Sequence, residues 1–284
     1  MSERGTEDGE DEALAQATQE GERQYHIEVA PGEVADTVLL PGDPDRVDEV
    51  VDVWDDHEAV ARHREYRTAT GRYDDTPISV TSTGIGSPSA AIAVEELAEV
   101  GADTFLRVGS CGGLQPELDV GDLVITAGAV RVEGTSDAYV RESYPASASP
   151  EVVSALVAAA EQLGYDYHVG VTASTDSFYA GQGREGFGGY ESPEGEQLMR
   201  ELRAANVLNV EMEASAVCTL ANVYGLRAGA VCTVFANRTT GEFRTEGESE
   251  AARTASLATA ILAEMDRRKA AAGADHWHPG LALE

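Results

Sequence analysis

The sequence predicts a single α/β domain in three layers (αβα), with a central mixed, largely parallel β-sheet. Three observations lead to this prediction. Short, almost continuously apolar runs, typical of strands buried on both faces, alternate with segments of helical periodicity. No linker or internal repeat interrupts this alternation. The 284 residues, of which 42% are hydrophobic, are enough to bury one large core.

The expected elements follow one another regularly along the chain. The strands are apolar runs bounded by polar or glycine-rich turns, and they lie at Thr37–Leu40, Ile78–Ser82, Thr104–Val108, Leu123–Ala127, Val169–Ala173, Val207–Val210 and Ala230–Phe235. The helices have apolar residues at spacings of three and four, and they lie at Ser89–Val100, Glu151–Leu163, Glu194–Ala204, Glu213–Tyr224 and Glu248–Lys269. Another helix is expected after the first strand, because Asp43 suits a helix N-cap and Pro44 a first helical position.

The two ends of the chain differ from the middle. Residues 1–23 are acidic, rich in Gln and Gly and nearly devoid of large apolar side chains, so we expect a disordered tail. Residues 271–284 have a similar composition and are expected to form a C-terminal tail. The folded domain is therefore expected to span residues 24–270.

The charge of the chain is extreme. There are 51 acidic residues against 20 basic ones, the formal net charge is −31, and Lys269 is the only lysine. These carboxylates must coat the surface, where their repulsion opposes the compact state in dilute buffer. Salt at about 1 M shortens the Debye length to roughly 3 Å and removes this penalty. We therefore expect a halophilic protein, because an acidic protein of an ordinary cell would not explain the missing lysines.

Composition also restricts the partners and the compartment. Nucleic acids and anionic membranes require basic surfaces, so neither is an expected partner. No apolar run approaches the roughly 20 residues of a membrane helix, and residues 1–12 lack the apolar core of a signal peptide. Cys111, Cys218 and Cys232 are too few and too scattered for a disulfide framework or a zinc site. We expect a reduced, cytoplasmic protein.

Three strand ends carry residues suited to an anionic ligand. Pro41–Arg46 combines a glycine, a helix N-terminus and an arginine, although a simple strand-to-helix turn has the same composition. The glycines of Ser82–Ser89 could cradle a phosphate or merely form a tight turn. Arg107 interrupts an apolar strand and must meet an anion, which is either a structural carboxylate or a ligand. Ser110 follows it with a hydroxyl group.

Two further segments suit a sugar and a base. Glu211-Met212-Glu213 stands where a strand gives way to a helix, and a carboxylate there can accept two O–H bonds from a vicinal diol. The alternative is that these acids only complement the helix dipole. The segment 178–184 offers an aromatic ring, an amide and a guanidinium, which can contact the edge and face of a uracil ring. Without context it is equally a polar, glycine-rich loop.

Taken together and in this order, the segments resemble the nucleoside phosphorylase-I family, and in particular its bacterial-type uridine-specific branch. The resemblance runs from about Tyr25 to Lys269. The most specific matches are PGDPDRV at 41–47, HRE at 63–65, STGIG at 82–86, TFLRVG at 104–109, HVGVTAS at 168–174, EME at 211–213 and NRT at 237–239. The resemblance implies the nucleoside phosphorylase/hydrolase fold, and pentosyltransferase activity on uridine in nucleoside salvage.

The resemblance also implies roles for individual residues. The residues that would hold phosphate are Gly42, Arg46, Arg64, Arg107 and Ser110. The residues that would hold the nucleoside are His26, Phe178, Gln182, Arg184, Glu211, Met212, Glu213 and Arg238. Arg107, Arg184 and Glu213 would act directly on the reacting groups. Inorganic phosphate would be the co-substrate, and no organic cofactor is expected.

The family further implies an assembly. It is hexameric, a trimer of dimers with shared active sites, so Arg64 and His26 would serve the site of a neighbouring subunit. Related enzymes hold a monovalent cation between subunits, and Glu65, Ile85 and Ser89 match that site, with K⁺ as the expected ion.

Some residues beside the base depart from the family pattern. Phe235 and Ala236 replace aliphatic residues, and Val210 replaces a tyrosine. Purine-specific relatives carry an aspartate near Asn237 that protonates the base, and an asparagine cannot do so. This difference favours a pyrimidine. A purine nucleoside phosphorylase for guanosine or inosine, a nucleosidase that uses water and a non-catalytic nucleoside-binding protein remain the alternatives.

Overall fold

The computed structural model describes residues 23–245 and 248–282. Its strands are β1 (Thr37–Pro41), β2 (Asp56–His63), β3 (Tyr66–Tyr73), β4 (Thr76–Thr81), β5 (Thr104–Gly113), β6 (Leu123–Val132), β7 (Ala146–Ser147), β8 (Tyr167–Thr175), β9 (Asn209–Glu211) and β10 (Arg227–Asn237). Its α-helices are α2 (Arg46–Val51), α3 (Ser87–Glu99), α4 (Pro150–Leu163), α5 (Pro193–Ala204), α6 (Ala214–Tyr224) and α7 (Glu248–Ala272). The tail expected over residues 1–23 lies, up to residue 22, outside the described residues.

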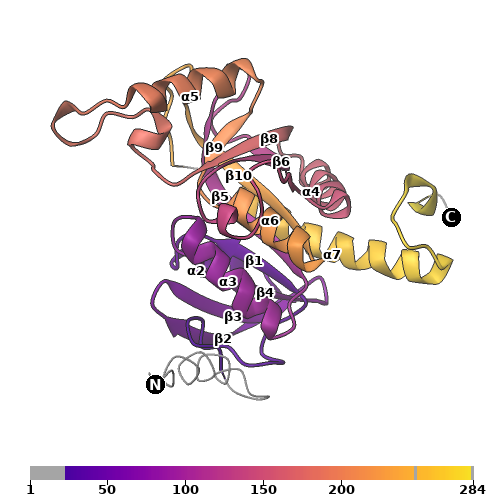
Figure 1. Ribbon diagram of the computed structural model, residues 1–284. Helices are drawn as coiled ribbons and strands as arrows, with labels where there is room; N and C mark the ends of the chain where they lie inside the picture. Colours follow the sequence, from indigo (N-terminus) through magenta and orange to yellow (C-terminus); the bar gives the residue numbers. More distant parts are fainter. Residues whose placement is uncertain (1–22, 246–247, 283–284) are drawn as a thin grey trace, which may run out of the picture.

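The sheet is mixed and partly closed. Its strands follow the order β10-β6-β8-β9-β5-β1-β4-β3-β2, and β10 also pairs with β5. Five strands, β5, β10, β6, β8 and β9, therefore form a closed barrel, from which β1, β4, β3 and β2 continue as an open sheet (Figure 1). The described strands form parallel and antiparallel pairs, and the longest pairings, β10 with β5 and β6 with β8, are parallel, whereas β2, β3 and β4 pair antiparallel at one edge.

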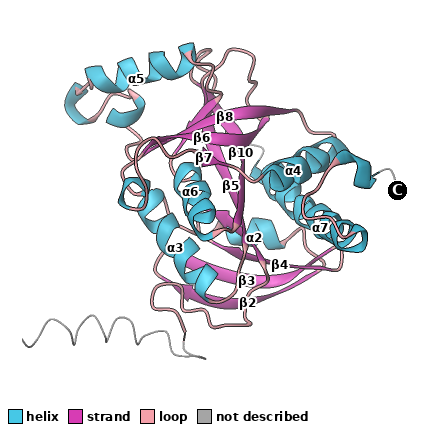
Figure 2. Cartoon of the chain, turned by 45° about the vertical axis from the view of Figure 1, so that its right-hand side comes forward, coloured by secondary structure: helices cyan, strands magenta, loops and turns pink. Residues whose placement is uncertain are grey.

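Helices pack in groups against this sheet. The helices α4 and α7 contact each other, and α2 contacts α7, while α3 packs against α6 (Figure 2). One apolar cluster joins α2, α4 and α7 to the sheet through residues such as Val50, Leu156 and Leu262. A second cluster joins α3 and α6 to the sheet through Val94, Leu97 and Leu220. The single α/β domain with a mixed sheet is confirmed, and the closure of five strands was not predicted.

Local sequence explains where several helices begin and end. Proline occupies the first turn of α3, α4 and α5, where its missing N–H removes no helical hydrogen bond. The hydroxyl of Ser192 accepts the N–H of Gly195 and caps α5. Gly164 and Gly225 end α4 and α6 in the left-handed conformation that glycine adopts without strain. Each of these signals can be recognised in the sequence.

All seven predicted strands and all five longer predicted helices overlap observed ones. The helix expected from Pro44 begins two residues later, at Arg46, after a tighter turn in which the N–H of Arg46 donates to the carbonyl of Asp43. The side chain of Asp43 accepts the N–H of Asp45 (2.9 Å) in that turn. The strands β2 and β3 were not predicted. Their sequences are rich in polar residues, and most of β2 is exposed, so they lack a buried apolar run. Within the described residues, no helix is long and apolar enough to span a membrane.

Candidate active site

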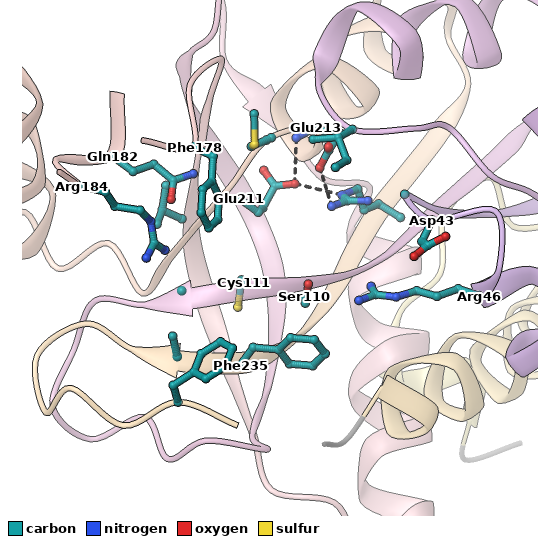
Figure 3. Close-up of a pocket in the computed structure, with 18 residues that line it drawn as sticks. Asp43, Arg46, Ser110, Cys111, Phe178, Gln182, Arg184, Glu211, Glu213 and Phe235 are labelled. Atoms are coloured by element: carbon teal, nitrogen blue, oxygen red, sulfur yellow. Dashed lines mark hydrogen bonds and ion pairs between the residues drawn. The ribbon is translucent and has the colours of Figure 1, made fainter. Parts of the chain in front are cut away.

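A cavity of about 340 Å³ gathers most of the predicted site residues. Residues from several parts of the chain line it: the β1–α2 turn, the β4–α3 loop, strand β5, the loop that follows β8, the junction of β9 with α6, the end of β10 and the segment after β10. Figure 3 shows Arg46 at one end and Gln182 and Arg184 at the other, with Glu211 and Glu213 between them. The cavity thus has a cationic end, an acidic middle and an end with amide and guanidinium groups.

A buried ion-pair cluster forms the middle of the cavity. Nε of Arg107 donates to Oε2 of Glu211 (2.9 Å), and Nη2 of Arg107 pairs with Glu213. Arg107, Glu211 and Glu213 are each at most 5% exposed. Two carboxylates therefore share one guanidinium in a site that is shielded from water, and their charges exceed the charge of that partner by one.

Backbone and hydroxyl donors stabilise Glu211 in its ionised form. Ser174 donates its hydroxyl to Oε1 (2.5 Å), and the N–H groups of Glu213 and Ala214 also donate to the carboxylate. Burial acts to raise the pKa of Glu211, but Arg107 and these donors outweigh burial, so that the pKa is lowered. Glu211 is the permanent anion of the pair.

Fewer hydrogen-bond donors stabilise the ionised form of Glu213. The N–H of Gly86 donates to its Oε1 (2.5 Å), and Arg107 pairs with its other oxygen. Burial raises the pKa of Glu213 to about 7, with a further upward contribution from the neighbouring Glu211. The Glu213 carboxyl therefore changes charge near neutral pH, and it lies on the cavity wall where a hydroxyl group of a ligand can reach it.

Arg107 retains one donor for a ligand. Its Nη1 is buried without a hydrogen-bond partner in the described residues. This nitrogen lies beside Gly42, because a Cβ atom placed on Gly42 would be 3.8 Å from it. The same Cβ would be 3.3 Å from the carbonyl oxygen of Gly84, so the two glycine loops approach closely. The structural interpretation of Arg107 holds for two of its nitrogens, which pair with carboxylates, and a ligand at the third nitrogen stays a prediction.

Arg46 and Ser110 complete the cationic end. Both line the cavity, and the guanidinium of Arg46 lies 5.6 Å from the centre of the Phe235 ring. Asp43 also lines this end, with its carboxylate engaged by the N–H of Asp45. Two guanidinium groups, a hydroxyl and a tightly turned backbone form a site suited to a small oxyanion.

The opposite end carries the predicted base contacts. The Phe178 ring is 48% exposed, and the guanidinium of Arg184 stacks on it at 4.2 Å from the ring centre. Gln182 is buried and donates one N–H to the hydroxyl of Thr175 (3.1 Å), which leaves its second N–H as a donor and its carbonyl oxygen as an acceptor. Val210, Phe235 and Ala236, the residues that depart from the family pattern, line the cavity.

Arg238 lies behind this end rather than on its wall. Its side chain packs against Gly112, which does line the cavity, and its backbone carbonyl accepts Nη2 of Arg203 (3.1 Å). Burial lowers the pKa of Arg238 to about 10, helped by the charges of Arg184 and Arg203. Arg203 was not predicted, because an arginine near the end of an amphipathic helix has no distinguishing pattern.

Asn237 does not face the cavity. Its amide nitrogen donates to the carbonyls of Gln115 (3.0 Å) and Leu118 (2.6 Å). Its oxygen accepts the N–H groups of Thr239 and Thr240. All the hydrogen-bonding groups of this side chain are therefore engaged in the turn after β10. Asn237 supplies no acid to the base, and its main contribution is to the structure of that turn.

Two predicted residues lie away from this cavity. Arg64 occupies the β2–β3 turn with a left-handed backbone (φ 53°), and its guanidinium lies 5.4 Å from the centre of the Tyr25 ring. His26 packs edge-on against Tyr25 and shares a hydrogen bond with Glu96 through Nδ1 (2.5 Å). Neither Arg64 nor His26 lines the cavity of its own chain.

The three residues predicted to hold a cation lie around Gly84. A Cβ atom on Gly84 would be 2.9 Å from Cγ of Glu65 and 3.2 Å from Oγ of Ser89. Ile85 follows Gly84, is 79% exposed and lines the cavity rim. Glu65 and Ser89 are thus brought together by the fold, although 24 positions separate them in the chain.

A series of buried hydrogen bonds behind Glu211 was not predicted. Ser174 accepts the N–H of Ser215 (2.9 Å), and the hydroxyl of Ser215 donates to the buried carboxylate of Glu133 (2.9 Å). Glu133 also accepts the N–H of Ser136 (2.9 Å). This series of hydrogen bonds holds Ser174 in place, and Ser174 in turn orients Glu211. Small hydroxyl residues scattered over three segments have no sequence signature.

The fold and the cavity together give an α/β domain with arginines and a hydroxyl at one end of the cavity and a buried carboxylate pair in its middle. The family model of the phosphorylase superfamily matches residues 36–264. A uridine phosphorylase of Thermococcus kodakarensis is 60% identical over 93% of this chain and 95% of the relative. A guanosine phosphorylase of Halorubrum lacusprofundi is 45% identical over 77% and 86%. The uridine phosphorylase of Escherichia coli is 40% identical over 86% and 97%. This chain belongs to the phosphorylase superfamily and is an enzyme.

Proposed function

We propose that the enzyme catalyses the phosphorolysis of uridine to uracil and ribose 1-phosphate, a pentosyl transfer of nucleoside salvage, in the cytoplasm. The observation that carries the proposal is the order of groups in one cavity: an oxyanion end, a carboxylate pair and a base end. The relatives named as uridine phosphorylases support the choice of substrate. We assign the catalytic domain to residues 24–270 and tails to the residues on either side.

The phosphate site follows from the unpaired donor of Arg107. Phosphate would accept from Nη1 of Arg107, from Arg46 and from the hydroxyl of Ser110, with the backbone around Gly42 beside it. The Glu213 carboxylate, next to Met212, would accept the ribose hydroxyls. Since phosphate and ribose are held on the two sides of Arg107, the attacking oxygen is positioned at C1′, and much of the rate gain comes from this positioning.

The base end would stabilise the leaving group. As the bond between C1′ and the base breaks, its electron pair moves onto the uracil, and the ribose gains positive character. Arg184 and Gln182 are placed to stabilise the growing negative charge, as preorganised donors do in an oxyanion hole. Neither a covalent intermediate nor an acid–base histidine is needed, and inorganic phosphate is the only co-substrate of the reaction.

A monovalent cation fits the oxygen atoms near Gly84. Glu65 and Ser89 approach each other there and offer a carboxylate and a hydroxyl, hard donors of the kind that alkali cations accept. We propose that K⁺ is held by these two residues together with Ile85, at a contact between subunits. Its contribution would be structural, because the reacting groups are served by other residues.

We propose a hexamer, a trimer of dimers, whose sites are shared between subunits. The support is that Arg64 and His26 are held in place by Tyr25 and Glu96 yet lie outside their own cavity. Refolding a mixture of two inactive variants, Arg64→Ala and Glu213→Ala, should restore part of the activity, since one site of each hybrid dimer carries neither change. Hybrid dimers without activity would exclude this sharing.

Guanosine is the second candidate substrate, favoured by the 45% identity to the Halorubrum enzyme. Gln182 and Arg184 can also address the oxygen and ring nitrogen of a purine. Phosphate-dependent cleavage of uridine, guanosine and inosine, measured side by side, decides between them. We expect uridine to have the largest kcat/KM. Turnover without phosphate would indicate a nucleosidase, and binding without turnover a nucleoside-binding protein.

A further inference from the structure

Three guanidinium groups gather at the base end of the cavity. Arg184 comes from the loop after β8, Arg203 from the last turn of α5, and Arg238 from the segment after β10. In the described residues, none of the three forms an ion pair with a carboxylate. This is unexpected in a chain with 51 acidic residues and 20 basic ones. A cluster of like charges left without counter-charges indicates that a negative charge is present at another stage of the reaction.

The geometry links Arg203 to this cluster through specific contacts. Nη2 of Arg203 donates to the backbone carbonyl of Arg238 (3.1 Å), which joins α5 to the segment after β10. Nε of Arg203 and Nε of Arg184 are both buried without a hydrogen-bond partner in the described residues. The charges of Arg184 and Arg203 also help to lower the pKa of Arg238, after burial itself. Arg184 therefore lines the cavity, and Arg238 lies behind its wall at Gly112 with Arg203 bonded to it.

A structural explanation of Arg203 has to be weighed against this one. Arg203 is the basic residue in the last turn of α5, where a cation interacts favourably with the helix dipole. Its backbone carbonyl also accepts from Gln115 (3.1 Å). Dipole stabilisation alone, however, does not require the side chain to turn inward and leave Nε buried, since an exposed cation serves the dipole equally well. Arg200, on the same helix, is exposed and pairs with Glu196.

We propose that Arg203 is a positioning residue for departure of the base: it holds Arg238 in place and adds positive potential that favours a base leaving as an anion. The inference rests on the proposed phosphorolysis. In that step the C1′–N1 bond breaks, its electron pair passes to the base, and a phosphate oxygen forms the new bond to C1′. The base anion then takes a proton from solvent. Arg203 itself touches neither the substrate nor the reacting atoms.

The test compares Arg203→Gln with Arg200→Gln, which removes the same charge from the exposed face of the same helix. Both variants are assayed with uridine and with 5-fluorouridine, whose electron-withdrawing fluorine makes the base a better leaving anion. Arg203→Gln should lower kcat/KM about tenfold for uridine, as expected for loss of a hydrogen bond from a charged group, but only about threefold for 5-fluorouridine. Arg200→Gln should match the wild type with both substrates.

Other outcomes are equally decisive. Equal losses with both substrates, or losses no larger than those of Arg200→Gln, would show that Arg203 has only a structural role. Arg203→Lys keeps the charge and should stay within about threefold of the wild type, so a loss as large as that of the glutamine variant overturns the inference. If Arg203→Gln does not fold, Arg203→Lys alone decides: kcat/KM for uridine within about threefold of the wild type supports the inference, and a larger loss overturns it. A wild type inactive on uridine would instead refute the proposed function.

Discussion

At the residue scale, the two glutamates on Arg107 have different properties although they are two positions apart. Glu211 accepts four hydrogen bonds from backbone and hydroxyl donors besides that from Arg107, which hold its pKa low against the effect of burial. Glu213 has one backbone donor, and burial raises its pKa to about 7. The chain thus keeps a permanent charge on Glu211 and places the group that titrates on the cavity wall.

This difference predicts a pH dependence. The ionised Glu213 is the form that accepts ribose hydroxyls, so kcat/KM for uridine should rise with pH up to about 7 and then level off. Inorganic phosphate also changes its charge near neutral pH. The variant Glu213→Gln separates the titration of phosphate from that of Glu213. Glu213→Gln should lower kcat/KM by about 10- to 100-fold, the effect of one hydrogen bond to a charged group, and remove the limb that belongs to Glu213. An identical pH profile in the variant would contradict the assignment.

The pH dependence of stability that Glu213 causes is opposite in direction to the pH dependence of activity. The folded-state pKa of Glu213 lies above the ordinary value of 4.5, so its contribution to stability is fully present below about pH 4.5. That contribution is lost as the pH rises through about 7. The pH that favours activity therefore disfavours stability at this residue, and Glu213→Gln should lessen the decline of thermal stability between these two pH values.

The position of Gly42 predicts that a substitution there weakens phosphate binding much more than nucleoside binding. A Cβ atom there would lie 3.3 Å from the carbonyl of Gly84 and 3.8 Å from Nη1 of Arg107, the donor that we propose for phosphate. Gly42→Ala should raise KM for phosphate about tenfold or more and change KM for uridine much less, because removing access to a charged donor costs roughly 1.5–3 kcal/mol. Initial rates with each substrate varied in turn provide the measurement. Equal changes in the two constants would count against this phosphate site.

At the element scale, the single lysine joins the C-terminal segment to the domain. Lys269 of α7 donates to Glu151 of α4 (2.6 Å) and pairs with Asp266 (3.0 Å), and the other oxygen of Glu151 accepts the N–H of Trp277 (3.0 Å). Trp277 packs against the core cluster of α2, α4 and α7. Lys269 is therefore a half-buried link between two helices and the chain that follows them, unlike the exposed arginines beside it.

Lys269→Met should therefore lower stability. The change leaves Glu151 and Asp266 without one partner in a half-buried site, and we expect a loss of about 1–3 kcal/mol and a fall in Tm of roughly 2–9 °C. Arg267→Met is the matched control, since Arg267 is exposed and its ion pair in the described part of the chain is with Glu264 one turn away, a contact worth less than about 1 kcal/mol. Thermal unfolding in the same salt compares the two. Equal Tm values would remove this role of Lys269.

At the scale of the whole molecule, the charge of −31 predicts dependence on salt. Below roughly 0.5 M salt the Debye length exceeds about 4 Å, and repulsion among surface carboxylates should loosen subunit contacts and lower activity. Sedimentation and phosphorolysis assays over a salt series provide the measurement. KCl and NaCl at equal ionic strength distinguish screening from a specific cation. A chain that stays assembled and active without salt would exclude the halophilic interpretation.

Sequence alone determined the features that depend on local patterns. Apolar runs, prolines in first turns and glycines at helix ends are set by neighbours in the chain, so the order of strands and helices could be predicted. Short motifs likewise identified Gly42, Arg107, Gln182, Arg184 and Glu213, all of which line one cavity. Strands β2 and β3 could not be predicted, because a half-exposed edge does not need the apolar run that identifies a buried strand.

Tertiary structure decided what depends on distant partners. The closure of five strands requires β10 to pair with β5 as well as β6, and a pairing between segments more than a hundred residues apart leaves no local signal. Three other features arise in the same way. Glu211 and Glu213 have different pKa values, and the Asn237 side chain bonds within its own loop. Arg184, Arg203 and Arg238 lie close together. Charge, burial and hydrogen-bond supply belong to the folded environment of a residue, and its sequence neighbours do not determine them.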